Sequence, residues 1–381
     1  MTTFESLGLC PPLLKALEAE GYTTPTPIQQ QAIAPALDGR DVQGIAQTGT
    51  GKTAAFALPI LQRLAAQRRP AVRGACRVLV LSPTRELASQ IADSFRAYGK
   101  FIGVRVTTMF GGVPKGKQAR AMAGGVDVLV ATPGRLMDHM QDRTVRLDLT
   151  EVLVLDEADH MLDLGFIIPI RRIVSNIPAE RQTLFFSATM PKEIAGLAAT
   201  MLRDPVHVAV TPAATTVEKV EQAVIFCEAA QKRSVLFDLL GDVAKGRTLV
   251  FTRTKHGADK VVKYLEENGM PAAAIHGNKS QPQRERALAD FRSGNTRVLI
   301  ATDIAARGID VDGVSHVINY DLPNVPESYV HRIGRTARAG ASGMAISLCA
   351  GDERPFLKGI EKLTRTRVPA MGIPSRMAKA A

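Results

Sequence analysis

The sequence has few cysteines, and none of them is placed as in a metal-binding pair. Its four cysteines, Cys10, Cys76, Cys227 and Cys349, lie far apart, and no Cys-x-x-Cys pair occurs. This spacing argues against a zinc site. Three of them, Cys76, Cys227 and Cys349, lie in or beside apolar runs, so we expect buried, unreactive thiols and no disulfide bonds.

Long apolar segments are also absent. No part of the sequence approaches the roughly 18 consecutive apolar residues that a membrane-spanning helix needs, and no basic amphipathic segment points to a lipid surface. Residues 1–5 have neither the basic segment nor the apolar core of a secretory signal. We therefore expect a cytoplasmic protein without membrane association.

What the sequence does have is an excess of positive charge. It contains 48 Lys and Arg against 37 Asp and Glu, a formal net charge of +11. Such an excess favours a polyanionic partner such as nucleic acid, although a basic surface can also serve solubility alone. With 381 residues, of which 45% are hydrophobic and 22% charged, the chain is globular in composition and long enough for two domains.

Short apolar runs alternate with longer helical stretches in two series. Continuous apolar runs of this length are typical of parallel strands whose sheet is covered on both faces, and helices between them indicate right-handed βαβ units. We therefore expect an α/β fold with mainly parallel sheets flanked by helices. The runs are residues 78–81, 126–130, 152–155 and 183–186 in the first half, and 223–226, 248–251, 297–300 and 316–319 in the second.

A small, polar and proline-containing segment separates the two series. Its composition suits an exposed linker, which we place at residues 211–218. The predicted domains are then residues 1–210 and 219–352. Residues 353–381 are rich in Lys and Arg, and we interpret them as a terminal helix with a basic tail that adds nonspecific affinity, or as a solvated end without a role.

A phosphate-binding loop is indicated between an apolar segment, Val42 to Ile45, and a helix-compatible run, Ala54 to Leu64. Its glycines let backbone N–H groups surround phosphate oxygens, Lys52 supplies a charge to the β- and γ-phosphates, and the Thr53 hydroxyl is a ligand for Mg²⁺. Ala46 stands where the general motif has glycine. The candidate nucleotide-binding residues of this loop are Thr48, Gly49, Thr50, Gly51, Lys52 and Thr53.

Two carboxylates directly follow the predicted strand 152–155. Ligands of open α/β sheets bind at the carboxyl ends of strands. Asp156 is therefore a candidate for holding Mg²⁺, and Glu157 for orienting or deprotonating the attacking water. By itself an Asp-Glu pair after an apolar run also fits a solvated loop, but the upstream phosphate loop favours a catalytic role.

Recognition of adenine is a further hypothesis. Gln29 lies in a proline-rich segment before the phosphate loop, and its amide matches the N6–H donor and N7 acceptor of adenine. Such a pair discriminates between bases by about 1–3 kcal/mol. The ring of Tyr22 is a candidate for stacking on the purine. A purely structural, proline-stiffened turn is the alternative.

Together these residues resemble a DEAD-box RNA helicase core of the bacterial RhlE type. The match covers nearly all of residues 4–350, with the motifs in family order. The resemblance implies two tandem RecA-like domains. The matching segments, beside Gln29 and the phosphate loop, are residues 83–88, 111–112, 132–135, 156–159, 187–189, 250–253, 281–284, 301–303, 307–310 and 331–338.

Further roles follow from this resemblance alone. Arg335 and Arg338 would be arginine fingers, worth about 10³–10⁵ in rate, and their spacing would place them on one face of a helix. Asp310 would bond the ribose of ATP. The coupling of hydrolysis to RNA would involve Asp159, Ser187, Thr189 and His331.

The resemblance also implies the RNA contacts. Most are donors or backbone turns suited to phosphates and sugars, so we expect sequence-independent binding that weakens with salt and a preference for RNA through its 2′-OH. They are Thr84, Arg85, Gly112, Thr132, Arg135, Arg253, Gly277, Gln281, Arg284, Thr302 and Asp303. Two departures from the family pattern are Ala337, where glycine is usual, and His160, where arginine is common.

The predicted function is ATP-dependent, local and non-processive separation of short RNA duplexes, or RNP remodelling, with ATP and Mg²⁺ as cofactors. Two alternatives remain open at this point: a DNA-directed motor, and an ATP-regulated RNA clamp or annealing chaperone. Ribosomal or RNA-decay proteins are candidate partners by analogy, and the sequence carries no signal for an oligomeric state.

Overall fold

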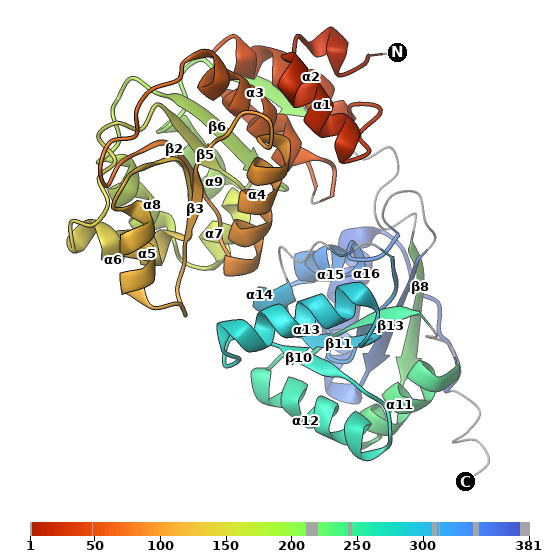
Figure 1. Cartoon of the computed structure of the whole chain (residues 1–381). Helices are drawn as coiled ribbons and strands as arrows, with labels where there is room; N and C mark the ends of the chain where they lie inside the picture. The colour runs from red at the N-terminus through yellow and green to blue at the C-terminus, as the bar shows by residue number, and fades with distance from the viewer. Residues whose placement is uncertain are drawn as a thin grey trace. The chain divides into compact units, whose positions relative to one another are not determined.

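The computed structural model describes residues 2–47, 49–210, 220–242, 246–306, 311, 313–337 and 343–373 (Figure 1). The chain divides into two compact units, Met1–Thr211 and Pro212–Ala381, and each is treated separately below. The expected linker, residues 211–218, lies outside the described residues.

The first unit is built on a seven-stranded sheet in the order β3-β4-β2-β5-β6-β1-β7. Every described pair of neighbouring strands is parallel. The strands are β1 (Val42–Ile45), β2 (Cys76–Leu81), β3 (Val106–Met109), β4 (Val126–Ala131), β5 (Val152–Leu155), β6 (Gln182–Ser187) and β7 (Val206–Ala209).

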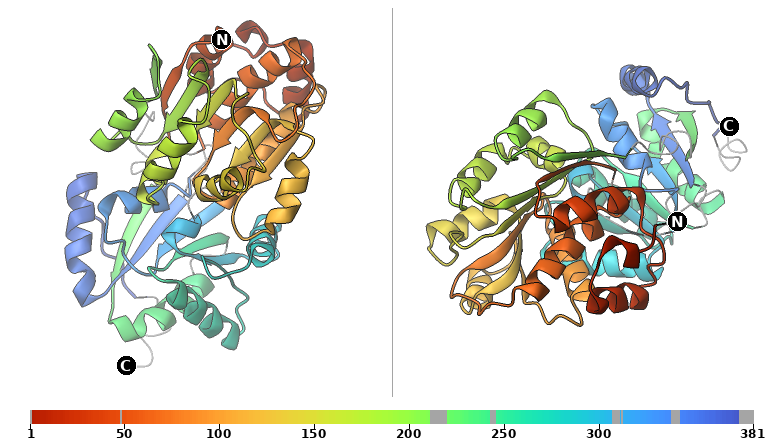
Figure 2. Two further views of the ribbon diagram at one scale, coloured as in Figure 1. Left: turned by 90° about the vertical axis from the view of Figure 1, so that its left-hand side faces the viewer. Right: turned by 90° about the horizontal axis from the view of Figure 1, so that it is seen from above.

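Helices cover both faces of this sheet (Figure 2). Because successive side chains of a strand point to opposite faces, Val78 and Val80 of β2 pack with helices α1–α4, whereas Leu79 and Leu81 pack with α6–α9. The helices are α1 (Pro11–Ala19), α2 (Pro27–Leu37), α3 (Lys52–Ala66), α4 (Arg85–Tyr98), α5 (Lys115–Met122), α6 (Pro133–Gln141), α7 (Ala158–Asp163), α8 (Ile167–Val174) and α9 (Lys192–Ala199).

The second unit has a six-stranded sheet in the order β10-β11-β9-β12-β13-β8, again parallel throughout. Helices α13, α15 and α16 cover one face, and α11 and α12 cover the other. The strands are β8 (Val220–Phe226), β9 (Arg247–Phe251), β10 (Ala273–Ile275), β11 (Val298–Ala301), β12 (Val314–Asn319) and β13 (Gly343–Cys349). The helices are α11 (Lys232–Asp242), α12 (Lys255–Glu267), α13 (Gln281–Ser293), α14 (Asp303–Ala306), α15 (Pro326–Ile333) and α16 (Arg354–Thr364).

The segment after residue 352 packs into the second unit. Leu357 and Ile360 of α16 are buried in its core, and beyond the helix the N–H of Val224 donates to the carbonyl of Pro369 at 2.9 Å. The terminal helix expected after residue 352 is thus present as α16, and its apolar face covers the sheet of the second unit. Residues 374–381 lie outside the described part.

All eight apolar runs form strands, so the predicted α/β class is confirmed. Cys76 and Cys349 are buried, Cys227 is half-buried, and burial raises the pKa of all three thiols, that of Cys76 to about 12. Within the part of the chain that the structure describes, no helix is both long and apolar enough to cross a bilayer.

Candidate active site

The phosphate-binding loop joins β1 to α3 in the first unit. Gly49 and Gly51 have φ angles of 84° and 92°, a left-handed conformation that glycine adopts without steric cost. Lys52 is the first residue of α3 and is 5% exposed, and its Nζ donates to the carbonyl of Ala46 at 2.9 Å. The lysine ammonium is therefore held inside the loop that would surround the phosphates. Thr48 lies outside the described residues.

Gln29 holds this loop through its amide. The side-chain oxygen accepts from the N–H of Thr26 at 2.9 Å, and Nε2 donates to the carbonyl of Gly51 at 3.1 Å. A Cβ at position 51 would lie 2.4 Å from Nε2 of Gln29, so this close approach requires glycine. An amide has two acceptor and two donor positions, so each end of Gln29 keeps one for a base. Adenine recognition stays a prediction.

Tyr22 lies in an aromatic cluster rather than alone. Its hydroxyl is 2.8 Å from that of Tyr98, and its ring packs edge-on against Tyr98 and Phe4 at centroid distances of 5.7 and 6.2 Å. This cluster fixes the ring beside helix α2, whose first turn carries Gln29. Stacking of Tyr22 on a purine remains a prediction.

Asp156 and Glu157 follow the last residue of β5, and both are buried. Burial raises the pKa of Asp156 to about 6, and the nearby charge of Glu157 adds to this, whereas the positive charge of Lys52 opposes it. Glu157 has a φ of 53°, a left-handed conformation that is rare outside glycine. Such strain is concentrated at functional sites.

These residues fit a magnesium ion bound together with phosphates. Among the described residues, no group of three or more His, Cys, Asp or Glu side chains is arranged to hold a metal. Mg²⁺, however, usually takes one or two protein ligands, substrate phosphates and several waters. Two groups match that donor set, the carboxylate of Asp156 and the hydroxyl of Thr53. Burial disfavours the charge of Asp156, and a bound cation would compensate it.

Three of the four expected coupling residues, those of the first unit, are in contact. Thr189 donates through its N–H and its hydroxyl to the carboxylate of Asp159, at 2.9 and 2.8 Å. The hydroxyl of Ser187 accepts from the backbone N–H of Asp159 at 3.2 Å. The end of β6 is thus tied to the segment that follows β5.

His160 is a functional candidate whose position the sequence signalled only as a departure from the family pattern. Its Nδ1 lies 3.3 Å from a carboxylate oxygen of Glu157, and the ring is buried. The two residues are three apart in sequence, at the start of α7. His160 is therefore placed beside the carboxylate that the sequence predicts to act on the attacking water.

The expected RNA residues of the first unit follow three neighbouring strands. Thr84 and Arg85 come after β2, Gly112 after β3, and Thr132 and Arg135 after β4. These strands form one half of the sheet, and β5, β6 and β1, which precede the nucleotide and coupling residues, form the other. Neighbouring strands lie about 4.8 Å apart, so β4 and β1 are separated by roughly 20 Å.

Local contacts hold the RNA residues of the first unit in place. Thr84 is the N-cap of α4 and accepts from the N–H of Leu87 at 3.3 Å. Arg85 lies against Gly112, where a Cβ would meet its Nη1 at 1.8 Å. Arg135 donates to the carbonyl of Val113 at 2.7 Å. These three positions are therefore built into the sheet edge before any ligand binds.

In the second unit, the expected RNA residues again follow three adjacent strands. Arg253 comes after β9, Gly277 and α13 with Gln281 and Arg284 after β10, and Thr302 with Asp303 after β11. The sheet order β10-β11-β9 places these ends side by side. The two sheets thus carry their candidate RNA residues in the same way.

Two of these residues also hold the second unit together. Asp303 pairs with the buried Arg332, with Nη2 at 2.7 Å from the carboxylate. Arg253 donates to Glu353 at 2.9 Å, and Glu353 also binds the buried Lys232 at 2.5 Å. These structural partners were missed from the sequence, because they lie 29, 100 and 121 residues apart.

Of the two expected arginine fingers, Arg335 does not lie on a helix. Helix α15 ends at Ile333, with Gly334 as its C-cap, so Arg335 lies in the turn beyond it, and its Nε donates to the carbonyl of His331 at 3.2 Å. Ala337 has a φ of 54°, which no helix accommodates. Arg338 and Asp310 lie outside the described residues.

Two family models match the chain, in the order of the two units. The model described as DEAD/DEAH box helicase matches residues 26–197, and that of the helicase conserved C-terminal domain matches residues 231–340.

The chain is 44% identical over 365 residues to DEAD-box ATP-dependent RNA helicase 30 of Arabidopsis thaliana, covering 95% of this chain and 62% of the relative. It is 42% identical over 373 residues to DEAD-box ATP-dependent RNA helicase CshA of Bacillus subtilis, covering 98% and 74%. Neither name carries the RhlE label, so that subgroup stays a prediction.

Solved structures agree over the whole chain. Dbp5 of S. cerevisiae bound to RNA and ADP BeF3 has a TM-score of 0.87 at 32% identity, with 100% of this chain and 98% of that one covered. Mss116p bound to ssRNA and AMP-PNP also has a TM-score of 0.87, at 26% identity, with 100% and 81% covered. The predicted pair of RecA-like domains is confirmed. The chain belongs to the DEAD-box family of ATP-dependent RNA helicases.

Proposed function

We propose that this chain couples ATP binding and hydrolysis to the local, non-processive separation of short RNA duplexes or to the remodelling of RNA–protein complexes. The observation that carries the proposal is that the expected RNA residues and the expected nucleotide residues follow different strands of the sheet. In each unit, the expected RNA residues follow three neighbouring strands at one side of the sheet. In the first unit, the nucleotide residues follow the other strands.

In this proposal, residues of both units act on one ATP. Lys52 holds the phosphates, Glu157, oriented by His160, activates the water, and Arg335 and Arg338 stabilise charge on the transferring phosphoryl group. Bound Mg²⁺, held by Asp156 and Thr53, would neutralise charge on the phosphates. Hydrolysis therefore depends on both units, and RNA bound by both raises the affinity for ATP and is itself bound more tightly when ATP is present.

The contact between Asp159 and Thr189 supports the coupling of the two ligands. Asp159 follows the strand that carries the candidate catalytic carboxylates, and Thr189 follows β6, which lies between β5 and β1 in the sheet. A shift of either segment disturbs the bonds at 2.8 and 2.9 Å between them. The loss of one pair in a duplex costs about 1.4 kcal/mol of stacking, which limits one event to a few pairs.

The test compares the wild-type chain with Glu157→Gln. The variant keeps the size of the side chain but removes the base, so it should bind ATP and RNA with unchanged affinity and hydrolyse ATP slower by orders of magnitude. Lys52→Ala should instead weaken nucleotide binding, because it removes the charge beside the phosphates. Equal ATPase rates in wild type and Glu157→Gln would overturn the assignment of roles.

The substrate is tested in the same assay. ATPase stimulation by RNA but not by DNA of the same sequence is expected, and displacement of a short strand should require ATP. Annealing that is faster with ATP, without displacement, would favour the clamp or annealing function instead. We also propose a cytoplasmic location, because all four cysteines are free thiols, as expected in a reducing compartment.

A further inference from the structure

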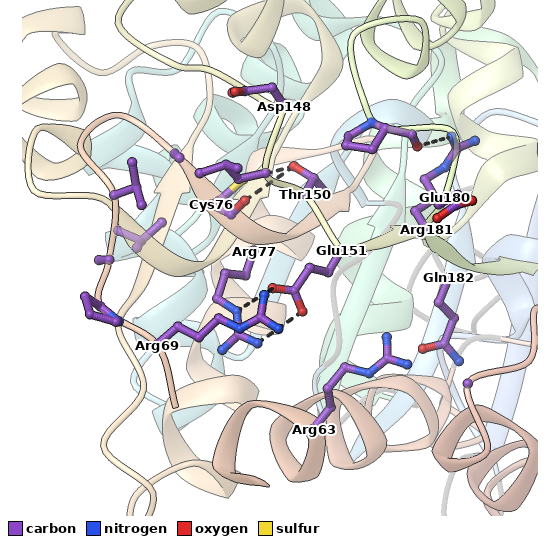
Figure 3. A pocket seen from close by; sticks show the side chains of 18 of the residues that line it. Arg63, Arg69, Cys76, Arg77, Asp148, Thr150, Glu151, Glu180, Arg181 and Gln182 are labelled. Carbon is purple, nitrogen blue, oxygen red and sulfur yellow. Dashed lines mark hydrogen bonds and ion pairs between the residues drawn. The ribbon is translucent and has the colours of Figure 1, made fainter. Parts of the chain in front are cut away.

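A pocket of about 720 Å³ opens in the first unit, at the edge of the sheet opposite the catalytic residues (Figure 3). Its lining includes the first residues of three strands, Cys76 of β2, Val126 of β4 and Gln182 of β6, and Glu151 just before β5. Strands of four to six residues are about 13–20 Å long, so the pocket is distinct from the ATP site at their carboxyl ends. Its volume lies in the range of small-molecule sites, roughly 300–1,000 Å³.

One side of the pocket is electrostatically balanced. Glu151 binds Arg77 through two bonds, at 2.8 and 3.1 Å, and Arg69 at 3.2 Å. Figure 3 shows Glu151 between these two arginines on one side and Arg181 with Gln182 on the other. Both oxygens of the Glu151 carboxylate are therefore already used.

The other side has arginines without a counter-ion. Arg63, Arg181 and Arg203 line this side together with one carboxylate, Glu180 (Figure 3). Among the described residues, no ion pair within 4.0 Å joins any of the three arginines to Glu180 or to another carboxylate. The Nε of Arg181 is buried and has no hydrogen-bond partner, and its Nη1 donates only to the carbonyl of Pro178, at 2.9 Å. A buried guanidinium donor without an acceptor is costly. Arg181 as a whole is only half-buried, so an anion at the accessible part of its guanidinium would offset this cost by its charge.

The charges around Arg181 also favour binding of an anion. Burial, and then the positive charge of Arg203, lower the pKa of Arg181, and Asp41 opposes them. The carboxylate of Asp41 is already engaged, because its two oxygens accept from the N–H groups of Thr183 and Arg203 at 2.7 and 2.8 Å. Both of its oxygens are thus occupied by backbone donors.

An apolar wall adjoins these arginines. Pro70, Ala71, Val72 and Leu149 line the pocket, and Val72 and Leu149 are 44% and 39% exposed. Exposed apolar side chains beside convergent polar groups are typical of sites for small organic ligands. The pocket therefore offers a cationic end and an apolar surface to one molecule.

We propose that this pocket binds a small organic phosphate, with its phosphate at Arg63, Arg181 and Arg203 and its apolar body against Val72 and Leu149. A phosphate monoester fits better than a carboxylate, because it carries up to two charges and three terminal oxygens for three guanidinium groups. RNA fits less well, since its phosphates lie along a chain and the cationic end lies inside a pocket.

The test uses phenyl phosphate as the probe and isothermal titration calorimetry on the full chain saturated with ADP and Mg²⁺, so that the phosphate loop is already filled. One saturable site is expected. Arg203→Ala and Arg181→Ala should each weaken binding by about tenfold or more, since each removes charge-assisted hydrogen bonds. Arg203 is exposed, so its variant should fold, which a thermal melt verifies.

The controls separate the parts of the proposal. Arg96→Ala, which removes an exposed arginine paired with Asp93 at 2.7 Å, should leave the affinity unchanged. Inorganic phosphate, without an apolar body, and phenol, without an anion, should each bind more weakly than phenyl phosphate. The proposal is overturned if phenyl phosphate does not saturate, if Arg203→Ala and Arg96→Ala bind it equally, or if a short single-stranded RNA displaces it at lower concentration than a second organic phosphate does.

Discussion

Asp156 shows at the scale of a residue how a catalytic position is held at a cost to stability. It is 2% exposed, and burial raises its pKa to about 6 from a usual value of 3.8. Folding therefore shifts this carboxyl group toward its neutral form relative to the unfolded chain, whereas binding of Mg²⁺ requires the carboxylate. The neighbouring Lys52 reduces this cost but does not remove it.

We predict that Asp156→Asn stabilises the ligand-free chain at pH 8 and abolishes ATPase activity. A raised folded-state pKa contributes stability that is present below about pH 4 and is lost as the pH rises through about 6. The asparagine escapes this loss of at most about 3 kcal/mol, so the melting temperature at pH 8 should rise by several degrees. The difference should vanish below pH 4.

The matched control is Asp93→Asn, an exposed position. It should change the melting temperature by no more than about a degree, because exposed ion pairs contribute little. A melting temperature of Asp156→Asn at or below that of wild type at pH 8 would refute the prediction.

Ala337 is a second residue in an unfavourable state, with a φ of 54°. A left-handed conformation costs a residue with a Cβ about 1–2 kcal/mol, and glycine at position 337 would remove this cost. The greater freedom of glycine in the unfolded chain would take back about 0.4–1 kcal/mol of that gain in stability. Ala337→Gly should therefore raise the melting temperature slightly. Ala195→Gly, at an exposed position in the middle of helix α9, should lower it. A decrease for both variants would contradict the prediction.

At the scale of the elements, α16 and the residue before it complete the second unit. Glu353 is 3% exposed and binds Lys232, which is 4% exposed, at 2.5 Å. It also accepts from Arg253 at 2.9 Å. Glu353, just before α16, thus completes a buried network of charged side chains. This part of the chain is therefore not a solvated tail.

Glu353→Ala should destabilise the second unit by at most about 3–5 kcal/mol, because the buried Lys232 then keeps only Asp321, at 3.5 Å, as a carboxylate partner. Urea unfolding followed by circular dichroism measures this loss. Glu266→Ala, an exposed position in α12, is the matched control and should change stability by less than about 0.5 kcal/mol. Similar unfolding curves for both variants would show that the network contributes nothing.

Internal strands were easier to predict from the sequence than edge strands. The runs at 78–81 and 152–155 are buried on both faces, and they were recognised because such strands are apolar throughout. Strands β3, β7 and β10 were not anticipated, and all three lie at sheet edges, where side chains are partly exposed and the apolar run is broken. Strand β13 is internal but contains Gly343 and Ser347, which interrupt its pattern.

At the scale of the whole molecule, the proposed mechanism requires both units for catalysis. Lys52 and Glu157 belong to the first unit, and Arg335 to the second. The isolated residues 1–211 should therefore bind ATP but show no RNA-stimulated ATPase activity, and Arg335→Ala in the full chain should lower turnover by about 10³-fold or more.

A coupled-enzyme ATPase assay with and without RNA measures both effects. A thermal melt of residues 1–211 verifies that this unit is folded, and nucleotide affinity verifies that its loop is intact. RNA-stimulated hydrolysis by residues 1–211 at the rate of the full chain would refute the need for the second unit.

The sequence by itself determined the chemistry and the alternation of strands and helices, because the phosphate loop, the Asp-Glu pair and the apolar runs are local patterns of a few residues. Only the tertiary structure decided the strand order, the packing of residues 353–373 and the pairing of Lys232 with Glu353. The tertiary structure also brought together Arg63, Arg181 and Arg203 in the proposed phosphate pocket, although they come from segments far apart in the chain. Contacts of this kind arise from side chains that meet only after the sheets have formed, and no local pattern encodes them.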